Sequence, residues 1–259
     1  MSLTLTKKGN APLAVVKGGE HDGDIIYLNS QIPGTGSKSK GAAAKEYPSL
    51  KLEDEGQFQQ IPNTTKERDV GVVVGSSGSG KSTYIRNYCI QYKKTYKNRE
   101  IYVFSNLTED KNLDSIRLNR VRIDDSLIEE PLTMEDFRDS LLIFDDTDVI
   151  PDKVLKAAVY SLLDQALQTG RHFNTSVIIS QHLPNSKHLR VALTEMFWFC
   201  YFPWGSTGST RYVLENYCGV DTKNLAKIKA TKSRWACVFK NFPQCVLTEK
   251  NIFLLSNEV

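Results

Sequence analysis

A glycine-rich segment has the residue types and the spacing needed to hold a chain of phosphates. Residues 75–82 read GSSGSGKS, which satisfies the pattern G-x-x-x-x-G-K-[ST] in full. Glycines let the backbone approach a ligand closely with positive φ, and the N–H groups of the loop and of the following helix then point at the phosphates. A strand-like run before the loop and an amphipathic pattern after it provide the required context. The pattern alone leaves a plain glycine-rich turn before a helix as the alternative.

Two side chains of this loop have specific expected roles. Lys81 would place a positive charge at the β- and γ-phosphates, and the Ser82 hydroxyl would bind Mg²⁺. We therefore expect ATP and Mg²⁺ as ligands. The expected nucleotide contacts are Gly75, Ser76, Ser77, Gly78, Ser79, Gly80, Lys81, Ser82 and Thr83.

A second chemical feature is the pair of carboxylates that follows the apolar run at 141–144. Asp145 is expected to hold Mg²⁺ through water. Asp146 is then the candidate catalytic base, which orients and deprotonates the attacking water. A strand ending in an Asp-rich turn is the alternative, and Asp148 is assigned no role.

The apolar run at 176–180 ends in a polar residue, Gln181. The interval between Lys81 and Asp145 has room for a strand before the acidic one. This is typical of the large branch of P-loop proteins in which another strand separates the loop strand from the acidic strand. The run at 176–180 would be that central strand, so the Gln181 amide would lie near the γ-phosphate and help to place the water. A glutamine that begins a surface loop is the alternative.

Strand and helix patterns alternate from Asp69 onward. Expected helices cover residues 82–98 and the segment from Pro151 to Gly170. Expected strands cover residues 70–74, 101–104, 121–123, 141–144, 176–180, 197–202, 235–239 and 245–247. Continuous apolar runs indicate strands covered on both faces. The predicted fold class is α/β: a P-loop NTPase with a RecA-like, mostly parallel central sheet flanked by helices. No helical lid is expected after the core, which argues against AAA+ proteins.

The first 66 residues have a different character. Short apolar runs at 13–16 and 25–28 flank glycine- and aspartate-rich turn formers, which predicts a small β-hairpin. The stretch at 32–45 is small, polar and basic, and is interpreted as a flexible loop or linker. The expected organisation is an N-terminal extension, residues 1–66, and a P-loop ATPase domain, residues 67–259.

The composition constrains the function of the protein less strongly than the motifs do. The five cysteines show no C-x-x-C spacing, which favours buried or free thiols in a reducing compartment. The net charge of +3 permits a nucleic-acid partner without arguing for one. No apolar run reaches the length of a membrane span, and the first ten residues lack the apolar stretch of a signal peptide. We expect the protein to act inside a cell, or inside something that assembles in one.

Four motifs together resemble one family. The segments GSSGSGKS, LLIFDD, GRHFN and SVIISQ look like the FtsK–HerA superfamily, and more narrowly like the genome-packaging ATPases of poxviruses, other large DNA viruses and virophages. The similarity covers about residues 68–205. It implies ATP hydrolysis that drives double-stranded DNA through a homo-oligomeric ring into a preformed capsid, with a capsid or portal protein as partner and a virion or virus factory as location. The superfamily usually has Glu where this chain has Asp146.

A ring motor of this kind requires a positive charge from the neighbouring subunit, because the transferred phosphoryl group spreads negative charge over its oxygens. Arg171 is the candidate, since it follows a helix end on the side away from the phosphate loop of its own chain. An arginine that balances the dipole of that helix is an equally open interpretation.

Two groups of basic residues outside the motifs are candidates for contact with DNA. Lys187, His188 and Arg190 form one group, and a larger group comprises Arg211, Lys223, Lys227, Lys229, Lys232 and Arg234. These side chains would track a DNA backbone without reading its sequence, although a solvated surface explains most of them better. Two other classes of function compete with the motor: a P-loop kinase, and a nucleotide-gated assembly module that does not hydrolyse ATP.

Overall fold

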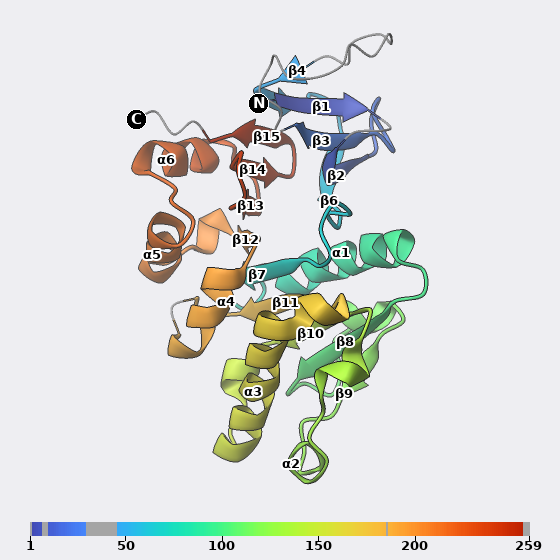
Figure 1. Ribbon diagram of the computed structural model, residues 1–259. Coiled ribbons are helices and arrows are strands. Elements are labelled where there is room, and N and C mark those ends of the chain that lie inside the picture. Colours follow the sequence, from blue (N-terminus) through green and yellow to red (C-terminus); the bar gives the residue numbers. More distant parts are fainter. Residues whose placement is uncertain (1, 7–9, 30–45, 185, 256–259) are drawn as a thin grey trace.

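The computed structural model describes residues 2–6, 10–29, 46–184 and 186–255. The stretch at 32–45, interpreted above as a linker, lies outside the described residues. Two sheets and the helices that cover them make up the described part of the chain (Figure 1).

The larger sheet has ten strands in the order β5-β15-β14-β13-β12-β7-β11-β10-β8-β9. Its strands are β5 Ser49–Lys51, β7 Val70–Val74, β8 Glu100–Ser105, β9 Asn119–Val121, β10 Ser140–Asp145, β11 Ser176–Gln181, β12 Trp198–Tyr201, β13 Ala236–Phe239, β14 Cys245–Thr248 and β15 Asn251–Leu254. Neighbours from β12 to β9 pair in parallel, whereas β13, β14, β15 and β5 pair antiparallel. The predicted mostly parallel sheet is confirmed, and β11 lies between β7 and β10 as expected.

Helices cover both faces of the parallel strands, with α1 on one side and α3 and α4 on the other (Figure 1). The α-helices are α1 Lys81–Thr95, α2 Ser126–Glu129, α3 Lys153–Thr169, α4 Arg190–Glu195, α5 Gly208–Asn216 and α6 Thr222–Ala230. Short 3-10 helices are η1 Leu113–Ser115, η2 Met134–Phe137, η3 Thr147–Val149, η4 Gly170–Phe173, η5 Lys187–Leu189 and η6 Pro203–Gly205. The α3 helix begins where the Asp152 side chain accepts hydrogen bonds from two backbone N–H groups, which is a favourable N-cap.

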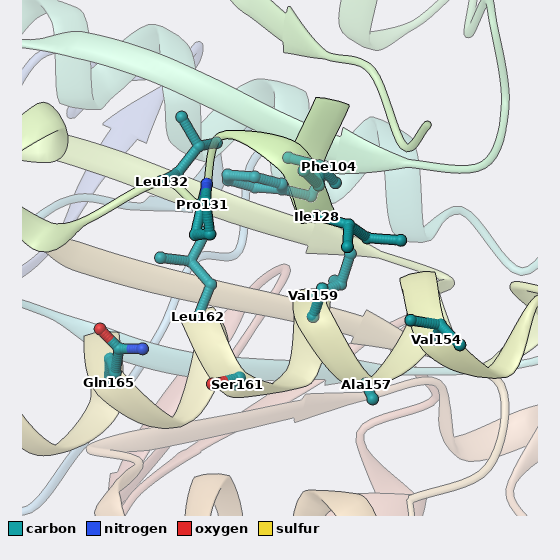
Figure 2. Close-up of a pocket in the computed structure, with 12 residues that line it drawn as sticks. Phe104, Ile128, Pro131, Leu132, Val154, Ala157, Val159, Ser161, Leu162 and Gln165 are labelled. Carbon is teal, nitrogen blue, oxygen red and sulfur yellow. The ribbon is translucent and has the colours of Figure 1, made fainter. Parts of the chain in front are cut away.

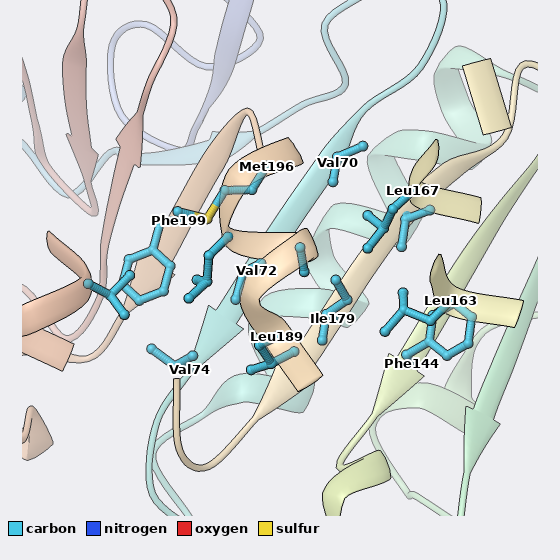
Figure 3. Packing of buried hydrophobic residues seen from close by; sticks show 14 of the residues in the cluster. Val70, Val72, Val74, Phe144, Leu163, Leu167, Ile179, Leu189, Met196 and Phe199 are labelled. Carbon is cyan, nitrogen blue, oxygen red and sulfur yellow. The ribbon is translucent and has the colours of Figure 1, made fainter. Parts of the chain in front are cut away.

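The alternation of side chains along each strand builds one apolar core on each face of the sheet. In β10, Leu142 and Phe144 join the core under α3, whereas Leu141 and Ile143 join the core under α1. Figure 3 shows Phe144 and Leu163 side by side in the first of these cores. Continuous apolar runs are therefore required in these strands, because both faces are covered.

The smaller sheet is antiparallel and has the order β4-β1-β3-β2-β6. Its strands are β1 Ser2–Thr6, β2 Ala11–Lys17, β3 Ile25–Asn29, β4 Glu46–Tyr47 and β6 Gln57–Gln60. The predicted hairpin is confirmed as the β2–β3 pair within this sheet. The division at residue 66 remains a prediction. The N-terminal part is closely joined to the rest, since β5 pairs with β15 of the larger sheet and Leu3 and Phe58 share a core with α1.

Between β12 and β13 the chain forms α5 and α6, which the sequence analysis did not predict. Both helices bury a few residues against the same core, for example Leu214 and Ile228. Within the described residues, none of the helices is both long and apolar enough to cross a bilayer.

Candidate nucleotide-binding site

A cleft of about 540 Å³ opens at the carboxyl edge of β7, β10 and β11. Its lining brings together the glycine-rich loop, the acidic pair and the residue after β11. The lining residues are Ser76, Ser77, Gly78, Gly80, Lys81, Ser82, Thr83, Leu107, Asp110, Asn112, Asp145, Asp146, Val149 and His182. Ligands of open α/β sheets bind at this edge of the strands.

The loop needs glycine at particular positions. Gly78 and Gly80 have φ values of 75° and 108°, and Gly80 is the N-cap of α1. A side chain at Gly75 would come within 2.8 Å of the Phe202 ring and 2.5 Å of the Ser79 hydroxyl. The loop therefore turns tightly into α1, and the N-terminal N–H groups of that helix are available to an anion.

Lys81 lies at the centre of the cleft and is 7% exposed. Its Nζ donates a hydrogen bond to the Gly75 carbonyl oxygen at 3.1 Å and lies 3.2 Å from His182 Nδ1. The Asp146 Oδ2 atom is 3.8 Å from the same ammonium. A buried ammonium next to backbone N–H groups is suited to a polyphosphate.

The two carboxylates differ in environment. Asp145 ends β10 at 4% exposure, and burial raises the pKa of its carboxyl above the usual value, as does the adjacent Asp146 charge. Burial also raises the pKa of Asp146, whereas Lys81 and His182 lower it in part. Asp146 has a φ of 46°, in the left-handed region, where Asp is several times more frequent than most residues. This backbone geometry gives a physical reason for Asp rather than Glu at this position.

The donor atoms in the cleft fit Mg²⁺. The Ser82 hydroxyl and the Asp145 carboxylate are hard oxygen ligands, and both residues line the same cleft. The Ser105 hydroxyl is 3.5 Å from Asp145 Oδ2. Within the described residues no cluster of three or more His, Cys, Asp or Glu forms an all-protein metal cage, and Mg²⁺ ordinarily uses one or two protein ligands with the substrate phosphates.

Gln181 lies at the end of β11 and is fully buried beside the cleft rather than in its lining. Its amide nitrogen is 3.1 Å from Thr147 Oγ1 and 3.4 Å from the Tyr160 hydroxyl. The Gln181 Oε1 atom has no partner among the described residues. Gln181 thus contacts the residue that follows Asp146, and its predicted role at the γ-phosphate remains a prediction.

Comparison with known proteins gives one close relative. The chain is 33% identical over 252 residues to the uncharacterized protein V3 of Sputnik virophage, and the match covers 96% of this chain and 97% of that protein. The chain belongs to the family of this virophage protein. A scan against models of protein families gives no match.

Two solved structures show the fold of this family member. The DNA-packaging ATPase B204 from Sulfolobus Turreted Icosahedral Virus is 19% identical with a TM-score of 0.50, covering 71% of this chain and 98% of that one. The cytoplasmic domain of the Type VII secretion ATPase EccC from Thermomonospora curvata is 12% identical with a TM-score of 0.51, covering 82% of this chain and 29% of that one. At these identities the likeness concerns the fold. It confirms the predicted P-loop NTPase fold, which this chain shares with a viral DNA-packaging ATPase.

Arg171 lies in η4, just before β11, at the amino edge of the parallel strands. Its Nε is 3.5 Å from Glu67 Oε2, and both side chains are about two-thirds exposed, at 66% and 65%. The carbonyl oxygens at the end of α3 are instead capped by Arg68, whose guanidinium donates to Ala166 and Leu167. These carbonyl oxygens thus have a different arginine as their partner, and both interpretations of Arg171 remain predictions.

His182 was missed as a site residue by the sequence analysis. Its ring contacts Lys81, Gly75 and Asp146 and lines the cleft. The available signal was its place directly after a strand predicted to lie next to the loop strand. Asp110 and Asn112 also line the cleft. They come from an irregular segment after β8, and no sequence pattern marked them as site residues.

A second hollow of about 410 Å³ lies between α2 and α3 (Figure 2). Figure 2 shows Phe104, Ile128, Val154 and Leu162 among the residues around this hollow. Phe104 and Leu162 are buried, whereas Ile128 and Val154 are exposed. None of the lining residues is titratable, so we assign the hollow no chemistry.

Proposed function

We propose that this chain is an ATPase that binds Mg·ATP in the cleft at the carboxyl edge of β7, β10 and β11. The observation that carries the proposal is the convergence of the Lys81 ammonium and the Asp146 carboxylate, 3.8 Å apart in one cleft at the end of a glycine-rich loop. The ammonium and the loop N–H groups would hold the phosphates. Mg²⁺ held by Ser82 and Asp145 would neutralise charge on the β- and γ-phosphates.

In the proposed reaction Asp146 orients a water molecule and accepts one of its protons. The water oxygen forms a bond to the γ-phosphorus while the bond from that phosphorus to the bridging oxygen breaks, so that ADP leaves with the bonding electron pair. The raised pKa of Asp146, which burial causes, makes this carboxylate a better proton acceptor than an exposed one. Gln181 would fix the Asp146–Thr147 turn through its hydrogen bond to Thr147.

We further propose that the ATPase works as a homo-oligomeric ring that moves double-stranded DNA into a preformed viral capsid, in a virion or virus factory, with a capsid or portal protein as partner. The family relationship to a virophage protein and the fold shared with the DNA-packaging ATPase B204 support this assignment. Arg171 supports the ring, because it lies exposed at the amino edge, about 20 Å along β11 from the cleft of its own chain. A head-to-tail contact between copies would bring it to the cleft of the next copy.

Arg171→Ala is therefore expected to lower the ATPase rate by about 10³-fold or more while ATP binding stays intact. Steady-state hydrolysis and nucleotide titration measure the two effects. Mixing this variant with Lys81→Ala is expected to restore part of the activity, since a mixed interface pairs an intact loop with an intact arginine. Glu67→Gln, which removes only the partner of Arg171, serves as the matched control and is expected to be active. Failure of the mixture to recover activity would contradict the contribution in trans.

The proposed DNA contact involves Lys187 and Arg190, which are exposed in the segment after β11, on the same edge as the cleft. In the larger basic group several cations have local partners: Arg211 pairs with Glu215, Arg234 with Glu249, and Lys227 lies over the Phe253 ring. This pairing makes the segment after β11 the better candidate.

The decisive experiment is the ATPase rate with and without double-stranded DNA, at about 50 and about 200 mM salt. We expect DNA to raise the rate at low salt and to do so less at high salt, since phosphate contacts weaken as salt rises. Lys187→Ala with Arg190→Ala is expected to reduce the DNA effect. Lys94→Ala with Lys97→Ala removes two exposed charges at the far end of α1, and this control variant is expected to keep the stimulation by DNA.

An ATPase rate that does not respond to DNA at low salt would contradict the motor function. Phosphate transfer to a small acceptor would indicate a kinase, and binding without turnover an assembly module.

A further inference from the structure

His182 follows β11 and lies between the two charged groups of the proposed ATPase site. Its Nδ1 atom is 3.2 Å from Lys81 Nζ and 3.2 Å from the Gly75 carbonyl oxygen. On the other side of the ring, Nε2 is 3.0 Å from Asp146 Oδ2. One imidazole thus contacts the lysine, the loop backbone and the candidate base.

The contact at Nε2 has a defined direction. The Asp146 carboxylate can only accept, so Nε2 carries a proton and donates it to Oδ2. At Nδ1 the ring meets a donor, the Lys81 ammonium, and an acceptor, the Gly75 carbonyl oxygen, each at 3.2 Å. The donation from Nε2 to Asp146 does not depend on which of these two contacts Nδ1 serves.

The hydrogen bond from His182 leaves the two oxygens of Asp146 in different situations. Oδ2 accepts from the ring, whereas Oδ1 is buried and has no hydrogen-bond partner among the described residues. The backbone N–H of Asp146 also donates to the Ser180 carbonyl oxygen at 2.9 Å, which fixes the turn from which the side chain extends. The carboxylate is therefore held with one oxygen engaged by the ring and the other without a hydrogen-bond partner among the described residues.

The ring also links Lys81 to Asp146. Its Nδ1 atom contacts the ammonium and its Nε2 atom contacts Oδ2, while the ammonium and Oδ2 themselves are 3.8 Å apart. The three side chains therefore form one contact group at the cleft.

We propose that His182 is a positioning residue for hydrolysis, which orients Asp146 by donating from Nε2 to its Oδ2 atom. The inference rests on the proposed ATPase function. It assigns His182 no contact with the reacting atoms.

A matched pair of variants tests the role of each ring nitrogen. In His182→Gln the side-chain amide can occupy the place of Nε2 and donate to Asp146. In His182→Asn the shorter side chain places its amide near Nδ1 and cannot reach Asp146 as a donor. His182→Asn is expected to lower kcat by about 10- to 100-fold with KM for ATP unchanged, and His182→Gln is expected to retain most of the rate. Thermal unfolding of both variants verifies that the fold is retained.

Two outcomes separate this inference from the proposed function. Equal losses in the two variants, or a change in KM without a change in kcat, would overturn the positioning role while the ATPase assignment stands. A wild-type chain that binds ATP but does not hydrolyse it would overturn the ATPase assignment, and the inference with it.

A measurement independent of activity reports whether Nε2 carries a proton. In ¹⁵N-histidine spectra of the wild-type chain, the resonances that disappear in His182→Gln identify the residue. We expect a proton on Nε2, which the hydrogen bond to Asp146 requires. An unprotonated Nε2 would contradict that hydrogen bond and overturn the inference.

Discussion

Lys81→Ala is expected to weaken the binding of Mg·ATP by about 10- to 100-fold, which is the effect of losing one or two charge-assisted hydrogen bonds to phosphate. Lys81 is only 7% exposed as a whole residue, so its ammonium would meet the phosphates in a site with little water. The loop N–H groups remain in the variant, and they account for the residual affinity that we expect. Titration with a fluorescent ATP analogue in the presence of Mg²⁺ measures the dissociation constant.

The control for this variant removes a lysine from the same helix. Lys94 is exposed in the last turn of α1, and Lys94→Ala is expected to leave the affinity unchanged. Thermal unfolding distinguishes a lost contact from a lost fold, because Lys81 also donates a hydrogen bond to the Gly75 carbonyl. Unchanged Mg·ATP affinity in a folded Lys81→Ala protein would refute the proposed site.

The central strands were predictable because burial on both faces imposes a simple pattern. Residues 70–74, 141–144 and 176–180 are short apolar runs, and they form β7, β10 and β11 in the expected order. The α1 helix was predicted from its amphipathic pattern, and Ile85, Cys89 and Tyr92 are buried at the spacings of four and three that place them on one helical face. In these segments local pattern and tertiary environment agree.

The elements that were missed have weaker local patterns. The α5 and α6 helices are polar along most of their surfaces and bury only a few residues, so no continuous apolar stripe marks them. In the N-terminal sheet, β6 has the sequence QFQQ, and its pairing with β2 joins residues far apart in the chain. Pairing between strands that are distant in the chain depends on the complete fold, and the periodicity of a short segment does not predict it.

The candidate site also has a part that could be predicted from the sequence and a part that could not. Its loop residues and Asp145–Asp146 belong to motifs whose spacing fixes their place, and they line one cleft. The direction of the Gln181 side chain could not be predicted, because it depends on Thr147 and Tyr160 in two other elements. The position of His182 after a strand predicted to lie beside β7 indicated that it would be near the loop, but its contacts with Lys81 and Asp146 depend on the complete fold.

Asp146→Asn is expected to lower the rate of ATP hydrolysis by about 10²- to 10⁴-fold, the usual effect of removing a general base. Asn also tolerates left-handed backbone, so the φ of 46° is accommodated and the fold should be retained. ATP affinity is expected to stay the same or to increase, because a negative charge near the phosphates is removed. Single-turnover hydrolysis, with nucleotide bound before the reaction is started by Mg²⁺, separates the chemical step from binding.

Two neighbouring carboxylates provide the controls for this variant. Asp148→Asn removes a charge two residues away, to which we assign no role, and is expected to leave the rate unchanged. Asp145→Asn is expected to raise the Mg²⁺ concentration needed for half-maximal rate, because Asp145 is the proposed metal ligand and lies with Ser82 in the cleft. The two aspartates are thereby distinguished, since added Mg²⁺ should recover activity in Asp145→Asn and not in Asp146→Asn. A full rate in folded Asp146→Asn would mean that water is activated without this carboxylate, and His182 would then have no base to position.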